Sequence, residues 1–369
     1  MGRFIMTPTS PLPPFTEIPA HLQSVLDYEL QAQHHIAEPT WHYLQGGAMY
    51  EQSLQENQQQ FKNIRLIPRH LKDLTQATTQ LNLFGLDYPH PIFLAPVGHQ
   101  ALFHPQAEQA TALAAQVMQS NLILSHLTNT HMADLNHQNP YKWFQLYWQG
   151  DRAQSLNLIK TAEQHNYKAI VITVDAPHTG IRDRERKANF YLPTDLVHPY
   201  SPPHQQDFSQ QHSIFQTLMR LAPVWEDIAW VVENTHLPVL LKGVLHPADA
   251  KKAVEYGIAG LVISNHGGRV LDGTIPPLIA LQKIRALVPE NYPLLIDGGI
   301  RRGSDIFKAI ALGANAVLVG RPYIYGLATA GALGVAHVLK VLKEELEITM
   351  ALMGTASVNE INQDFIYRD

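Results

Sequence analysis

The stretch Gly260-Leu261-Val262-Ile263-Ser264-Asn265-His266-Gly267-Gly268-Arg269 joins a short apolar run to a polar, glycine-rich turn. Residues 260–263 predict a buried β-strand, and residues 264–269 predict the loop that follows it. In a barrel of strand–loop–helix units, the chemistry lies at this C-terminal end of the strands. His266 can exchange a proton near neutral pH, and Arg269 can hold a carboxylate through two parallel hydrogen bonds. Taken alone, His266 fits a solvated residue at a capped strand end.

The same pattern recurs along the chain, which contains eight short apolar runs, most of them ending in Gly, Pro or polar residues. Helix-period segments separate most of these runs. Eight such βα units that close on themselves form a (β/α)8 TIM barrel, an α/β fold, and we expect that fold here. The expected strands are Pro91–Gly98, Asn121–Ser125, Trp143–Tyr147, Ala169–Asp175, Val239–Val244, Gly260–Gly267, Pro293–Gly299 and Ala316–Pro322.

Helices are expected between the strands and at both ends of the barrel sequence. Residues 20–75 look mostly helical and should cover one end of the barrel. The pattern over Val335–Met353 predicts a helix packed on the outside. The other expected helices are Gln106–Gln119, Asp151–His165, His246–Tyr256 and Ser304–Leu312.

The interval after the fourth strand, from Asp175 to Val239, is about twice the length of one βα unit. Its first part, Lys187–Gln211, is rich in Pro, His, Gln and Tyr, which predicts a long mobile loop beside the mouth of the barrel. Phe215–Trp230 should be the helix that completes the unit. The whole of 187–221 could act as a substrate lid, and its apolar patch 215–219 could touch a membrane or a partner, although packing against the barrel is the simpler expectation.

Length and composition limit the function classes. The length of 369 residues allows one large barrel domain or two smaller ones, and we expect a single domain over 20–369, after a flexible tail at 1–19 that lacks the apolar core of a signal peptide. A net charge of -5 gives no reason to expect nucleic acid. With no cysteine, the chain has no disulfide and no thiolate nucleophile or metal ligand, and we expect no metal site. A cytoplasmic location is expected, with peripheral contact at the inner membrane face left open.

Polar groups follow every expected strand, and together they suggest a flavin site. The small residues of Ala95–Gly98 would allow a flat ring to approach the backbone. Lys242 could stabilise an anionic reduced ring. Asp297–Arg301 and Gly320–Arg321 follow strands seven and eight, the usual phosphate site of this barrel. Glycine N–H groups and an arginine fork suit a phosphate monoester, which favours a mononucleotide such as FMN.

The chain resembles the FMN-dependent α-hydroxy acid oxidases and dehydrogenases, such as glycolate oxidase, lactate oxidase, L-lactate dehydrogenase and mandelate dehydrogenase. The resemblance covers about residues 25–365, and its most specific segment is Ser264–Arg269. The other matching segments are Phe93–Pro96, Phe144–Tyr147, Thr173–Asp175, Lys242–Gly243, Asp297–Gly303 and Gly320–Pro322.

This resemblance implies the residue roles. His266 would be the base, Asp175 would hold its imidazolium, and Tyr147 would reach the substrate hydroxyl. Arg182, Arg269 and Tyr43 would bind the substrate carboxylate. Arg184 or Arg186 could replace Arg182 in that role. The residues implied to hold FMN are Pro96, Val97, Gly98, Ser125, Gln145, Thr173, Lys242, Ser264, Asp297, Gly298, Gly299, Ile300, Arg301, Gly320 and Arg321.

The implied reaction is oxidation of an L-2-hydroxy acid to the 2-oxo acid, with oxygen or a quinone-type molecule as electron acceptor and a homotetramer as the usual assembly. Gly98 replaces the family's common alanine, which should leave room beside the flavin. Val97 replaces a hydroxyl residue, and Leu127 replaces an aromatic one, which hints at a substrate larger than glycolate. The alternatives are another FMN- or phosphate-binding barrel enzyme, or a catalytically silent binding protein of the same fold.

Overall fold

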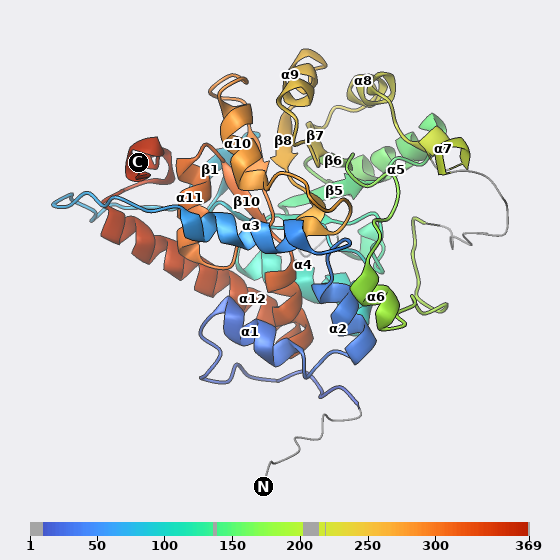
Figure 1. Cartoon of the computed structure of the whole chain (residues 1–369), viewed down its shortest axis with the longest axis horizontal. Helices are drawn as coiled ribbons and strands as arrows, with labels where there is room; N and C mark the ends of the chain where they lie inside the picture. Colours follow the sequence, from blue (N-terminus) through green and yellow to red (C-terminus); the bar gives the residue numbers. More distant parts are fainter. Residues whose placement is uncertain (1–9, 136–138, 202–213, 218, 368–369) are drawn as a thin grey trace, which may run out of the picture.

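The computed structural model describes residues 10–135, 139–201, 214–217 and 219–367. Eight parallel strands close into a barrel in the order β10-β3-β4-β5-β6-β7-β8-β9, which confirms the predicted fold (Figure 1). Each strand coincides with an expected run, and most are shorter than it. The barrel strands are β3 (Ile92–Leu94), β4 (Leu122–Leu124), β5 (Lys142–Leu146), β6 (Ile170–Thr173), β7 (Val239–Lys242), β8 (Gly260–Ile263), β9 (Leu294–Ile296) and β10 (Ala316–Val319).

Helices surround this barrel, and the four expected between strands are confirmed within two residues at each end. They are α4 (Ala107–Val117), α5 (Arg152–Gln164), α9 (Pro247–Glu255) and α11 (Gly303–Ala311); α10 (Pro277–Arg285) joins β8 to β9. The expected C-terminal helix is part of a longer one, α12 (Arg321–Met353), which is broken by non-helical backbone at Ala330 and Gly331.

Helix α12 is long and apolar enough to cross a membrane by length and composition, but 72% of its most apolar window is buried inside the protein. It packs against α1 (Val25–Ala32), α4 and α11. Figure 1 shows it running along the side of the barrel, beside α1. We therefore interpret α12 as a core helix of the domain.

The single helix expected over Phe215–Trp230 is wrong. The structure has a short α7 (Ile214–Thr217) and a separate α8 (Trp225–Glu233), with Val224 extended at the start of α8. Pro223 explains the break, because the residue before a proline is disfavoured in helical backbone. The packing expected for this patch is also wrong at Phe215, whose side chain is 81% exposed.

The barrel interior is apolar toward its N-terminal end. Inward-facing side chains from the strands, among them Phe93, Trp143 and Leu318, form one buried cluster with side chains of the hairpin β1 (Leu81–Leu83) and β2 (Leu86–Tyr88). Phe84 at the hairpin turn meets the Trp143 ring at a centroid distance of 5.6 Å. The hairpin therefore closes this end of the barrel.

The N-terminal helices pack around the C-terminal end and flank of the barrel. They are α1, α2 (Glu38–Gln45) and α3 (Gln52–Asn63), and α3 contacts the turn after β8, as expected for a cover segment. Within the predicted tail, residues 1–9 lie outside the described residues. Further along, the Leu12 and Phe15 amides donate to the carbonyls of His34 and Thr329, at 2.9 and 2.8 Å.

Candidate functional site

A ring of polar side chains lies on the C-terminal side of the apolar interior, two residues further along the strands. Successive side chains of a strand face opposite sides, so the residue two positions after an inward apolar side chain also faces inward. In this way Trp143 precedes Gln145 on β5, and Leu240 precedes Lys242 on β7. The members of the ring are 0–7% exposed, and all were predicted: Ser125, Gln145, Thr173, Lys242, Ser264 and Asp297.

Lys242 is the buried cation of this ring. Its Nζ lies 2.9 Å from an Asp297 carboxylate oxygen and donates to the Ser264 hydroxyl at 2.8 Å. Burial alone would lower the pKa of Lys242, but the carboxylates of Asp297 and Asp175 outweigh it and raise the pKa above its usual value. The ammonium is therefore a fixed positive charge at the centre of the site.

His266 follows β8 and is held between two side chains. Its Nδ1 lies 3.0 Å from Asp175 Oδ1, and its Nε2 lies 3.5 Å from the Tyr147 hydroxyl. Its own backbone is left-handed, with φ 58°, and its amide donates to the Ser264 hydroxyl. The predicted pairing of His266 with Asp175 is therefore present in the structure, at the mouth of the barrel.

Asp175 reaches His266 because the residue beside it has no side chain. A Cβ on Gly243 would lie 2.5 Å from Asp175 Cβ, and Gly243 also has φ +106°. Burial raises the pKa of Asp175, but the charge and hydrogen bond of His266, with the charge of Lys242, bring the pKa below its usual value. Asp175 is thus a carboxylate that can hold Nδ1–H and leave Nε2 as the basic nitrogen.

Tyr147 closes the other side of the imidazole. Burial, reinforced by the nearby charge of Asp175, raises the pKa of Tyr147 well above its usual value. Its hydroxyl therefore keeps its proton at neutral pH and can act as a hydrogen-bond donor.

The side chain of Tyr43, on α2, lies beneath two guanidinium groups. Arg269 is 5.0 Å and Arg182 5.8 Å from the centroid of its ring. Arg269 Nη1 donates to the carbonyls of Tyr43, Leu44 and Gly46, at 2.7, 3.3 and 2.9 Å. The end of α2 thus anchors Arg269 through one nitrogen, as carbonyls at a helix C-terminus attract cations.

Arg182 precedes α6 (Asp183–Lys187) and pairs with Glu185 on that helix. Its Nε and Nη2 donate to the two Glu185 oxygens at 2.5 and 3.3 Å. The neighbouring Arg184 instead pairs with Glu51. Because Arg182 is the one that lies over Tyr43, the structure favours it over Arg184 among the arginines of this run.

The predicted phosphate site contains Arg301, from the loop after β9, and Arg321, the first residue of α12. Arg321 donates to the carbonyls of Leu44, Gly46 and Gly267, at 2.9–3.2 Å. Burial, together with the charges of Arg269 and Arg301, lowers the pKa of Arg321 to about 9. An anion at this point would relieve the repulsion among these arginines, which suits a phosphate.

Two orphaned polar atoms test whether a flavin fits. Among the described residues, Gln145 Nε2 and Asp297 Oδ1 are buried without a hydrogen-bond partner, whereas Gln145 Oε1 accepts from Ser125 and from the His126 amide. A buried polar atom without a partner is costly, so these two atoms are suited to a polar ligand. A Cβ on Gly320 would meet nothing closer than 3.8 Å, which leaves space beside Val97. The ring fits the polar edge of a flavin.

Comparison with known proteins identifies the family. A model of the FMN-dependent dehydrogenase family matches residues 32–368. The chain belongs to the FMN-dependent dehydrogenase family. It is 44% identical to an L-lactate oxidase of Alicycliphilus denitrificans, over 95% of this chain and 98% of that one. It is 39% identical to a 4-hydroxymandelate oxidase of Amycolatopsis orientalis, over 91% and 95%.

The fold comparison agrees with this assignment. A crystal structure of mandelate oxidase superimposes with a TM-score of 0.85 at 38% identity, covering 94% of this chain and 98% of that one. The chain is therefore an oxidoreductase of 2-hydroxy acids, and FMN is its cofactor. The assignment favours this class over the other phosphate-binding barrels and the silent binding protein considered above.

The contacts that brace the site were not predicted from the sequence. Asn57 on α3 and Asn265 exchange two amide hydrogen bonds, at 2.8 and 2.9 Å. Phe190 stacks on Tyr43 at 4.5 Å, and His198 meets His99 at 4.8 Å. The described start of the predicted loop therefore lies against the site, and its residues 202–213 lie outside the described residues. Only the aromatic content of that loop signalled these contacts.

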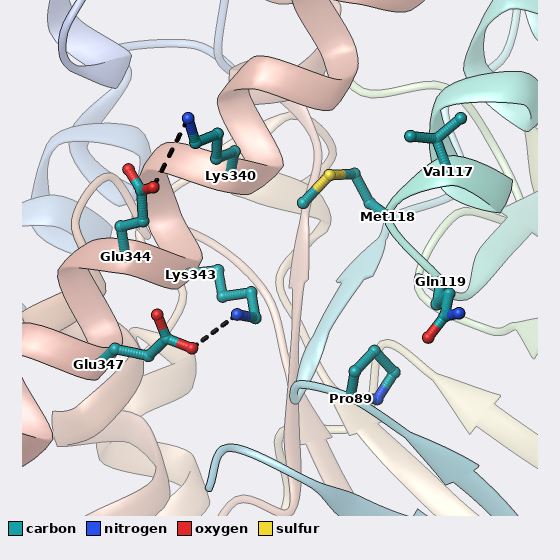
Figure 2. Close-up of a pocket in the computed structure, with 8 residues that line it drawn as sticks. All are labelled: Pro89, Val117, Met118, Gln119, Lys340, Lys343, Glu344 and Glu347. Carbon is teal, nitrogen blue, oxygen red and sulfur yellow. Dashed lines mark hydrogen bonds and ion pairs between the residues drawn. The ribbon is translucent and has the colours of Figure 1, made fainter.

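A separate groove lies between the end of α4 and α12, near the N-terminal ends of the strands (Figure 2). Its charged residues pair with one another along α12, Lys340 with Glu344 and Lys343 with Glu347. None of the predicted site residues lines it. The groove is therefore separate from the flavin site.

Proposed function

We propose that this enzyme oxidises L-lactate, or a somewhat larger L-2-hydroxy acid, to the 2-oxo acid and passes the electrons to oxygen. The observation that carries the proposal is His266 held between Asp175 and Tyr147, close to two arginines that share the Tyr43 ring. A base beside a carboxylate-binding pair is what removal of hydrogen from a 2-hydroxy acid requires.

The chain supplies the binding and the proton chemistry. Arg182, Arg269 and Tyr43 bind and orient the substrate carboxylate. His266 takes a proton from the substrate through Nε2, and Asp175 stabilises the imidazolium and fixes its tautomer. Tyr147 donates its hydrogen bond to the substrate oxygen.

FMN, when bound, accepts the two electrons removed from the substrate. Its polar edge would meet the ring of Gln145, Lys242 and Asp297, and its phosphate would meet Arg301 and Arg321. The remaining predicted residues line the same end of the barrel, and we assign them to the cofactor: Pro96, Val97, Gly98, Ser125, Thr173, Ser264, Gly298, Gly299, Ile300 and Gly320.

The substrate size rests on Leu127 and Gly98. A Cβ on Gly98 would lie 2.7 Å from Leu127 Cβ, so the missing methyl group makes room for Leu127. An aliphatic side chain here suits a methyl or another small apolar substituent on C2 of the substrate. The names L-lactate oxidase and 4-hydroxymandelate oxidase among the relatives support lactate or a larger acid, and oxygen as acceptor.

The test is an anaerobic visible spectrum of the purified holoenzyme. L-Lactate should bleach the flavin band, D-lactate should not, and admitted air should restore the band within seconds. Slow reoxidation that a quinone accelerates would replace oxygen as acceptor. A band that no 2-hydroxy acid bleaches would contradict the proposed reaction. The tetramer, the cytoplasmic location and the peripheral membrane contact stay predictions, which size-exclusion chromatography and cell fractionation can check.

A further inference from the structure

The two arginines assigned to the substrate carboxylate are each anchored along one part of the guanidinium. Arg269 is held at Nη1 by three carbonyls from the end of α2. Arg182 is held at Nε and Nη2 by the carboxylate of Glu185. In both cases only some N–H groups of the guanidinium donate to the described residues, so the other N–H groups can donate to a ligand.

Arg182 and Glu185 form a bidentate ion pair. The two bonds run in parallel to one carboxylate, the arrangement that fixes both the position and the plane of a guanidinium. Both side chains are mostly buried, with exposed fractions of 18% and 17%. Among the described residues, Arg182 Nη1 has no hydrogen-bond partner, so this end remains for a carboxylate.

Glu185 also reduces the net positive charge around Arg182 and Arg269. Arg182 lowers the pKa of Arg269, after the larger effect of burial, while Glu185 raises it. Two guanidiniums and one carboxylate leave a net charge of about +1, by formal charges at neutral pH. That charge matches a substrate with a single carboxylate.

We propose that Glu185 is a positioning residue for the substrate: it holds Arg182 by the Nε–Nη2 edge and presents Nη1 to the carboxylate of a monocarboxylic 2-hydroxy acid. This inference rests on the proposed function of the same site. Glu185 does not touch the reacting atoms and acts only through Arg182.

If Glu185 instead competed with the substrate for Arg182, its removal would have the opposite effect on KM. If Glu185 had to leave Arg182 before the substrate could bind, its removal would tighten binding. If it positions Arg182, its removal frees the guanidinium to rotate over the Tyr43 ring and weakens binding. The sign of the change in KM therefore separates the two roles.

The experiment compares holoenzymes of Glu185→Gln, Glu185→Asp and Arg184→Gln with wild type. Glu185→Gln should raise KM for L-lactate by roughly ten- to a hundredfold, with a much smaller change in kcat, because a misplaced guanidinium weakens carboxylate binding equally in the ground state and the transition state. Glu185→Asp keeps the charge and should recover part of the loss. Arg184→Gln removes the neighbouring ion pair with Glu51 and controls for a general weakening of α6.

A binding measurement supplies a readout besides turnover. Pyruvate, titrated against the oxidised enzyme and followed by the flavin spectrum, should lose affinity in Glu185→Gln by the same factor as KM rises. An unchanged or lower KM, or an equal rise in Arg184→Gln, would overturn the inference. Failure of the proposed function looks different, because then the wild-type flavin itself is not bleached by L-lactate.

Discussion

The two ends of this barrel are built from the same strands but differ in the side chains that fill them, which are mainly apolar at one end and polar or charged at the other. At the N-terminal end, Trp143 and Phe93 pack against the β1–β2 hairpin in an apolar cluster. Two residues further along β5, Gln145 has a buried nitrogen with no partner among the described residues. The lower layer is filled by its own side chains, although Trp143 Nε1 and the Tyr88 hydroxyl are also buried there without a hydrogen-bond partner among the described residues. The upper layer is instead lined by buried polar and charged side chains suited to a ligand. Stability and chemistry are thus separated by two residues along each strand.

The largest effect is expected from a change at the upper end. His266→Asn should lower kcat/KM for L-lactate by about 10²–10⁴-fold, because the general base is lost. Asparagine suits the test because it tolerates the left-handed backbone of this position. Stopped-flow bleaching of the flavin measures the rate, and the flavin content and urea midpoint should remain close to wild type. A marked fall in the urea midpoint together with the fall in kcat/KM would contradict the separation of stability from chemistry.

The opposite result is expected at the lower end. Trp143→Ala should reduce the free energy of unfolding by about 3–5 kcal/mol, because it leaves a cavity in the closed cluster. Urea titration measures that loss, and KM for L-lactate should change little in the folded fraction. Leu71→Ala is the control, because the Leu71 side chain is fully exposed. A large change in KM would show that the lower cluster shapes the upper site.

An intermediate result is expected where the cover helix meets the site. Asn57→Ala removes both amide bonds to Asn265 and should cost about 1–3 kcal/mol of stability, since Asn265 is buried and keeps only the longer bonds to Gly268 and Thr274, at 3.2 and 3.4 Å. Because Asn265 precedes His266, a moderate fall in kcat should accompany it. A double-mutant cycle with Asn265→Ala measures the coupling, and strictly additive effects would rule out a direct contribution of the pair.

The smallest effect concerns pH. The pKa of Asp175 lies below its usual value in the folded protein, so its contribution to stability is present above the unfolded pKa of about 4 and is lost as the pH falls through the folded value. The difference in urea midpoint between wild type and Asp175→Asn should therefore fall as the pH drops below about 5, and a difference that stays constant in acid would contradict this contribution. A difference that changes near neutral pH would indicate another titrating group.

Local patterns predicted most of the fold because the strands are bounded by Gly, Pro and polar residues, and because helical and strand periods differ. The polar ring was predicted for the same reason, since each member follows an apolar run. The α7–α8 break was missed because the apolar spacing over Phe215–Trp230 hid the effect of Pro223.

Contacts between distant segments could not be predicted from these patterns. Nothing near Arg321 indicates that carbonyls at the end of α2 will hold it. The partner of Arg182 was equally hidden, because three other cations in the same run, Arg184, Arg186 and Lys187, could have paired with Glu185. Such choices depend on how segments pack in three dimensions and not on their own sequence.

The last turn of α2 has a thermodynamic consequence, because it holds an arginine assigned to the substrate and an arginine assigned to the cofactor. Gly46 O accepts from both Arg269 and Arg321, at 2.9 and 3.1 Å. A ligand that draws on one guanidinium changes how firmly the other is held. Linkage makes this coupling reciprocal: whatever factor the cofactor contributes to substrate affinity, the substrate returns to cofactor affinity. On the proposed assignments, the Gly46 carbonyl couples the retention of FMN to the occupancy of the substrate site.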